Sequence, residues 1–131
     1  MVDILDVIYQ RFVQNSTIQA HCEDRIYYYT YPETADKSKP FLIISPLEPP
    51  IEDIFGSDSG TVERVSIQID VESQNRLTAK EIQLAVKEEL KRLNITQDLG
   101  GLDDYFPETT RYVDSRRYSG LPFSLYEEEF K

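Results

Sequence analysis

The residues best suited to nucleophilic catalysis in this 131-residue chain are one histidine and one cysteine, and they are neighbours, His21 and Cys22. A Cys-His pair or a Ser-His-Asp triad would have to use them. Adjacent side chains on a strand point to opposite faces, so the two are poorly placed to act together. The pattern therefore favours a small buried thiol beside a surface imidazole. A single cysteine also excludes a disulfide within the chain and suits a reducing compartment.

Metal and cofactor sites need residue patterns that the chain lacks. A zinc site takes about four Cys, His or carboxylate ligands at suitable spacings. Gly100-Gly101 does not match a phosphate-binding glycine loop, and it follows a predicted helix instead of a strand. Residues 98–104 do not supply the alternating oxygen ligands of a calcium-binding loop. We therefore expect no cofactor and no metal.

Carboxylates are the remaining candidates for catalysis, because the chain holds 24 Asp and Glu residues. A glycosidase needs two of them facing one cleft, which a sequence cannot show. A small hydrolase with paired carboxylates therefore remains one interpretation. A simpler interpretation is that these carboxylates lie in solvated acidic loops. We predict that the protein is not an enzyme.

A cluster of tyrosines raises the question of nucleic-acid binding. Its members are Tyr27, Tyr28, Tyr29 and Tyr31. Tyrosines can stack on bases in a single-strand binder, but such a site needs interleaved Lys and Arg, and few lie nearby. The net charge of −10 also argues against nucleic acid as the main ligand. Alternate positions on a strand share one face, so we expect part of the cluster in the core and part at a protein interface.

Length and composition bound the architecture that must position these residues. A chain of 131 residues can bury one core but has no room for two, and 40% hydrophobic residues exclude a wholly disordered chain. No apolar run approaches the ~18 residues of a membrane span, so we expect no membrane partner. The first residues also lack the basic stretch of a signal peptide.

Hydrophobic periodicity predicts six elements in the order α-β-β-β-α-β. The helices are expected over residues 3–14 and 78–94, and the strands over residues 25–31, 41–44, 61–72 and 111–118. Asp3 can cap the first helix, and Asn15 should end it. Thr78 and Glu81 match a capping box at the start of the second. This pattern predicts an α+β fold with a single sheet of about four strands and two helices packed on one face.

The segments 47–60 and 95–108 are expected to be long irregular loops, and they carry much of the acidity. Residues 48–58, 98–108 and 127–129 hold eleven of the 24 acidic residues and no Lys or Arg. Apolar residues accompany them. We take as candidate interface residues Pro49, Ile51, Ile54, Phe55, Tyr105, Phe106, Tyr126 and Phe130. These side chains either anchor the loops on their own domain or meet neighbouring subunits, since apolar groups ringed by charge are typical of interaction surfaces.

The layout resembles the small tail-completion or head–tail joining proteins, similar to tail terminators, of long-tailed (siphovirus) bacteriophages and prophages. The matching features run from the first helix through Arg25-Ile26-Tyr27, Tyr31-Pro32-Glu33 and Pro40-Phe41-Leu42-Ile43-Ile44 to the strand Val65–Val71. The helix Thr78–Asn94 and the strand Arg111–Tyr118 complete it. The resemblance covers residues 1–120, which we take as one domain followed by a C-terminal tail, residues 121–131.

The resemblance implies a structural virion protein, assembled in the host bacterial cytoplasm, that forms a homo-oligomeric ring, commonly a hexamer. Such a ring caps the tail tube and docks on the head connector, so the implied partners are tail-tube and head-connector proteins. DNA would pass through it without specific binding, because an acidic wall repels phosphates. The candidate acidic lumen consists of Glu48, Glu52, Asp53, Asp58, Asp98, Asp103, Asp104 and Glu108. The alternatives are a non-enzymatic protein-interaction module of the cell and a head-closure connector component.

Overall fold

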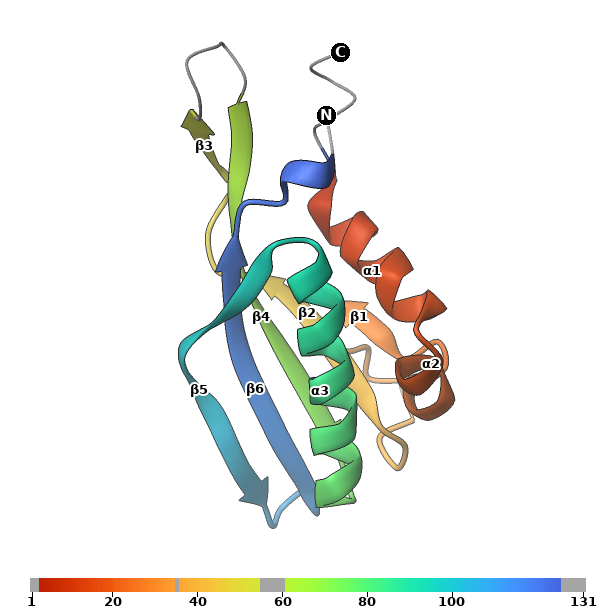
Figure 1. Ribbon diagram of the computed structural model, residues 1–131. Helices are drawn as coiled ribbons and strands as arrows, with labels where there is room; N and C mark the ends of the chain where they lie inside the picture. The colour runs from red at the N-terminus through yellow and green to blue at the C-terminus, as the bar shows by residue number, and fades with distance from the viewer. Residues whose placement is uncertain (1–2, 35, 55–60, 126–131) are drawn as a thin grey trace.

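The computed structural model describes residues 3–34, 36–54 and 61–125 as one mixed sheet with helices packed on one face (Figure 1). The helices are α1 (Ile4–Gln14), α2 (Ser16–Cys22), α3 (Arg76–Arg92) and the short 3₁₀ helix η1 (Phe123–Leu125). The strands are β1 (Ile26–Tyr28), β2 (Phe41–Pro46), β3 (Ile51–Ile54), β4 (Thr61–Ser73), β5 (Ile95–Phe106) and β6 (Arg111–Gly120). The predicted α+β class is confirmed, but the described residues form more elements than the sequence indicated.

The strands follow the order β1-β2-β4-β6-β5, and β3 pairs with the first part of β4. β1 and β2 run parallel, and all other pairs are antiparallel. β2 is a buried strand between β1 and β4, as its continuous apolar run indicated. β4 shows the predicted alternation, with Val65, Ile67, Ile69 and Val71 buried.

The core lies between β2, β4, β6 and the helix layer. The helices contribute apolar residues at helical spacing: Ile4, Ile8 and Phe12 from α1, Ile18 and Cys22 from α2, and Ala79, Ile82, Val86 and Leu90 from α3. Leu125 also packs against this core, and Asn94 Nδ2 donates to the Leu121 carbonyl over 3.0 Å. The chain after β6 is therefore held against the domain as far as Leu125.

The helix starts differ from the sequence-based expectation in two places. Asn15 ends α1 but also caps α2, because its Oδ1 accepts from the amides of Thr17 and Ile18, both over 3.0 Å. Asn75, not Thr78, caps α3, since Asn75 Oδ1 accepts from the Thr78 amide over 3.0 Å. The predicted capping box is therefore wrong, and α3 begins at Arg76.

Three segments differ from their predicted conformation. The tyrosine-rich strand ends at Tyr28, because Tyr29 has φ of 67° and turns the chain out of the sheet, so Tyr27, Tyr29 and Tyr31 do not share a strand face. Both segments expected to be irregular contain strands. Residues 51–54 form β3, and residues 95–106 form β5, a long strand paired with β6. In β5, backbone hydrogen bonding supplies the regularity, since only Ile95 of this strand is buried.

Candidate interaction surface

The predicted interface residues around β3 lie on the molecular surface. Ile51 is 52% exposed, and Pro49 is exposed just before β3. The backbone of Ile54 belongs to β3, but its side chain lies outside the described part of the structure. Phe55, Tyr126 and Phe130 also lie outside the described residues. Among the side chains that the structure describes here, Pro49 and Ile51 are the exposed apolar candidates.

Tyr105 and Phe106, the interface candidates at the other end of the sheet, are partly anchored on their own domain. Tyr105 is 40% exposed, and its ring lies 4.7 Å from that of Tyr112 on β6. Phe106 is 36% exposed and lies beside the turn into β6. Tyr105 thus anchors the β5–β6 pair, and both side chains still offer an apolar surface.

The predicted acidic residues fall into two separate groups. Glu48 and Glu52 are exposed near the β3–β4 pair, at one end of the sheet. On β5 and in the turn after it, the exposed acids are Asp98, Asp103, Asp104 and Glu108, and Figure 1 shows this turn at the opposite end of the sheet from β3. The side chain of Asp53 and the whole of Asp58 lie outside the described structure. One subunit does not bring the two groups together.

An exposed leucine on β5 was not among the sequence-based candidates. Leu99 is 96% exposed, although it belongs to a strand. The register between β5 and β6 shifts here: Gln97 faces Tyr118 and Gly101 faces Arg116, so β5 advances four residues while β6 advances two. The extra residues form a bulge that carries Leu99 away from the sheet. The two glycines directly after Leu99 were the sequence feature that could have indicated this bulge.

Two further leucines are exposed on α3. Leu77 is 66% exposed and Leu84 is 54% exposed, and their spacing of seven residues places them on one side of the helix. Because Asn75 is the cap of α3, Leu77 lies within the first turn and faces solvent.

A buried carboxylate connects α3 to β6. The Asp114 side chain is only 3% exposed; it accepts from Lys80 Nζ over 2.8 Å and from Arg116 Nε over 2.9 Å. Burial raises the pKa of Asp114, but the hydrogen bonds from Arg116 and Lys80 and the charges of both outweigh it, so the pKa lies below its usual value. Lys80 also pairs with Asp103 on β5. The cluster thus fixes α3, β6 and β5 to one another.

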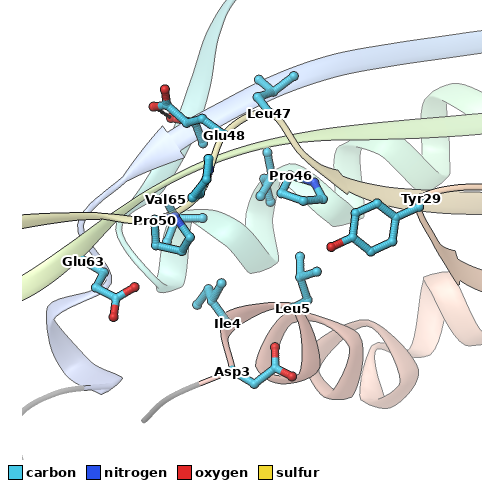
Figure 2. Close-up of a pocket in the computed structure, with 13 residues that line it drawn as sticks. Asp3, Ile4, Leu5, Tyr29, Pro46, Leu47, Glu48, Pro50, Glu63 and Val65 are labelled. Atoms are coloured by element: carbon cyan, nitrogen blue, oxygen red, sulfur yellow. Dashed lines mark hydrogen bonds between the residues drawn. The ribbon is translucent and has the colours of Figure 1, made fainter.

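A groove lies on the other side of β4 from β5. It has a volume of about 720 Å³ and runs between the start of α1, the end of β2 and the β3–β4 pair. Figure 2 shows Leu5, Tyr29, Leu47 and Pro50 around the open space. The lining is mostly apolar, and Asp3, Glu48 and Glu63 stand among the lining residues.

The His21–Cys22 pair lies on α2, not on a strand. Cys22 is fully buried, and this burial, partly offset by the nearby Arg25 charge, raises the pKa of the thiol to about 12. His21 Nε2 lies 2.8 Å from Glu81 Oε2 on α3 and thus faces away from the thiol. The expected buried thiol is confirmed, and the imidazole is half-buried at the surface.

Within residues 3–34, 36–54 and 61–125, no group of three or more His, Cys, Asp or Glu side chains is arranged to hold a metal ion. No helix among these residues is long and apolar enough to cross a membrane.

Comparison with known proteins gives a match in fold. A chain of the solved structure described as the virion of a native gene transfer agent particle superposes with a TM-score of 0.58. The match covers 87% of this chain and 90% of that chain, at 12% sequence identity. No protein-family model and no curated protein sequence matches the chain. The two chains therefore share a fold across nearly their whole lengths.

Proposed function

We propose that this chain is a structural protein of a phage-like virion and forms a closed ring at the head–tail junction or at the head-proximal end of the tail. The observation that carries the proposal is the fold shared with a virion chain over most of both chains. On this proposal the protein is located in the virion and acts without catalysis.

The distribution of exposed apolar side chains supports assembly into a ring. One group lies on the free edge strand β5 and the other around the groove between α1, β2 and β3–β4. Two different patches on one subunit can bind each other between copies, and such heterologous contacts close into a ring when the rotation permits. A chain that used one self-complementary patch would form a dimer instead.

The acidic residues support contact with passing DNA. A ring at this place has to let the genome through, and carboxylates along its channel repel the phosphates, so the DNA does not adhere. Glu48 and Glu52 near β3, or Asp98 and Asp104 on β5, are exposed and available for such a wall, whereas Asp103 is exposed but paired with Lys80. Because Asp104 lies at the opposite end of the sheet from Glu48 and Glu52, these carboxylates can face the channel at different heights.

Immunogold electron microscopy of the particles tests the proposal. An antibody against this chain should label tailed particles at one point, where head and tail meet, and should label isolated tails at one end. Label on the capsid surface, along the tail tube or only in the particle-free fraction would contradict it. Label that stays with the heads when tails are detached would identify the head-closure alternative.

A further inference from the structure

The bulge at Leu99 requires its glycines. Gly100 and Gly101 have φ of +97° and +125°, in the region that favours glycine. A Cβ on Gly101 would lie 2.2 Å from the Ser115 carbonyl oxygen, so no larger residue fits against β6 there. The backbone conformation thus leaves two extra residues of β5 unpaired with β6 and exposes the Leu99 side chain to solvent. Such a bulge re-aims a side chain, and bulges of this kind recur at functional surfaces.

The fold itself gives Leu99 nothing to pack against. At 96% exposure it is the most exposed large apolar residue of the described chain, well above Tyr29 and Leu77 at 66%. Tyr105, on the same strand, packs on Tyr112, so β5 can anchor its apolar residues where the fold needs them. Leu99 is not anchored, so its apolar surface is available to another molecule.

The groove offers an apolar lining that complements the exposed Leu99 side chain. Its lining combines exposed apolar residues such as Leu47, Pro49 and Pro50 with deeper ones such as Val65 and Ile67. It is therefore a place where an apolar side chain could be removed from water. Leu99 cannot reach the groove of its own subunit, because β6 and β4 separate β5 from β2 in the sheet.

We propose that the Leu99 bulge of one subunit inserts into the groove of the next copy, and that this contact, repeated, closes the ring. The inference rests on the proposed function, since it names the contact that would build the ring. The occupant of the groove is accordingly a second copy of this chain. The contact is heterologous, as ring closure requires.

Charge favours this pairing of surfaces. Lys87 lines the hollow beside the bulge, and the Arg117 side chain runs along Gly100. Neither forms an ion pair within the part of the chain that the structure describes. Against these two cations stands Asp98, next to Leu99. The groove carries Asp3, Glu48 and Glu63, so a cationic knob would meet an acidic rim.

Direct pairing of edge strands is a weaker alternative for the same two regions. β5 and β3 each have a free edge, but β5 carries Asp103 and Asp104 and β3 carries Glu52 and Asp53. Like charges on facing strands repel, and charged edges are a common protection against strand addition. The knob-and-groove contact avoids this repulsion.

Cysteine cross-linking tests the contact directly. The double variant Leu99→Cys/Leu47→Cys places one thiol on the knob and one in the groove, both at exposed positions. The native Cys22 is buried and does not interfere. A short bis-maleimide should produce a ladder of covalent multimers that ends at the copy number of the ring. The control Leu84→Cys/Leu47→Cys, which places an exposed thiol on α3 outside the contact, should give no ladder.

Native mass spectrometry of the wild-type chain, alone and on purified tail tubes, separates the two levels of the proposal. A ring with no Leu99–Leu47 ladder would overturn the contact and leave the proposed function standing. A chain that stays monomeric under both conditions would overturn both. An intramolecular cross-link in Phe130→Cys/Leu47→Cys, without a Leu99 ladder, would assign the groove to the chain's own C-terminal segment and also overturn the contact.

A second variant measures the contact without new thiols. Leu99→Asp places a carboxylate against the acidic rim. The subunit concentration below which the ring dissociates should therefore increase at least tenfold. Leu84→Asp changes an exposed leucine outside the contact and should leave that concentration unchanged. Equal effects of the two substitutions, or none from Leu99→Asp, would contradict the proposal. Circular dichroism of each variant confirms that the fold is intact.

Discussion

β4 and β5 flank the same strand, β6, but most β4 side chains are buried or half-buried and most β5 side chains are exposed. β4 alternates buried and half-buried residues along most of its 13 positions and supplies four residues to the core. β5 has 12 residues, of which only Ile95 is buried. β4 is therefore ordered by burial, and β5 by its backbone ladder to β6 and a few polar anchors such as Lys80–Asp103. The difference suggests that β4 serves folding, whereas β5 is free to serve binding.

The largest effect on stability is expected in β4. Ile69 is fully buried, so Ile69→Ala leaves a cavity and should lower the free energy of unfolding by about 3 kcal/mol. Urea denaturation followed by circular dichroism measures it. A loss below about 1 kcal/mol would contradict the contrast between β4 and β5, because the stability of β4 would then not depend on burial.

The next effect is expected at the bulge of β5. Gly101→Ala forces a Cβ against the Ser115 carbonyl and should cost about 2 kcal/mol, since backbone must shift to admit it. Gly100→Ala is the matched control: its Cβ would meet only the Arg117 side chain at 3.7 Å, so it bears the positive φ alone and should cost about 1 kcal/mol. Equal losses for the two variants would show that the bulge relaxes more easily than the structure indicates.

The buried carboxylate between the two regions should have an effect of similar or smaller size. Asp114→Asn weakens the charged hydrogen bonds from Lys80 and Arg116 and should lower the free energy of unfolding by about 1.5 kcal/mol near neutral pH. The folded-state pKa of Asp114 is lowered, so its contribution is fully present above the unfolded pKa of about 4 and is lost as the pH falls through the lower folded value. Denaturation at a series of pH values checks this. A difference between wild type and variant that grows on acidification would contradict the assignment.

The smallest effect on stability is expected at Leu99. Leu99→Ser removes an apolar group that touches nothing within the subunit, so the free energy of unfolding should change by less than about 0.5 kcal/mol. Thermal unfolding of the dissociated subunit measures it. A loss above about 1 kcal/mol would mean that the leucine packs on its own domain, and the contrast between β4 and β5 would lose its basis.

The same contrast explains what the sequence could predict. β2, β4 and the body of α3 were predicted correctly because their buried positions carry apolar residues at regular spacing, as in the alternation of Val65, Ile67 and Ile69. β5 was expected to be irregular because glycines and acids interrupt it, and a ladder of backbone hydrogen bonds leaves no such trace. α2 was missed because Asn15 looks like a break, although it is also a cap.

The candidate surface was predictable only in part. Clusters of acids next to apolar residues drew attention to Ile51, Tyr105 and Phe106, and the structure shows all three exposed. Leu99 could not be separated from a core leucine, since exposure depends on the bulge and the bulge on a register that only the folded pair defines. The groove joins residues from four distant segments, which no local pattern connects.

Native mass spectrometry of the purified chain, alone and after addition of tail tubes, tests the central claim most directly. We expect a single closed species of defined copy number, about six by resemblance to ring-forming tail proteins, with no open series of intermediate sizes. A chain that remains monomeric in both samples, or that forms only a symmetric dimer, would contradict it.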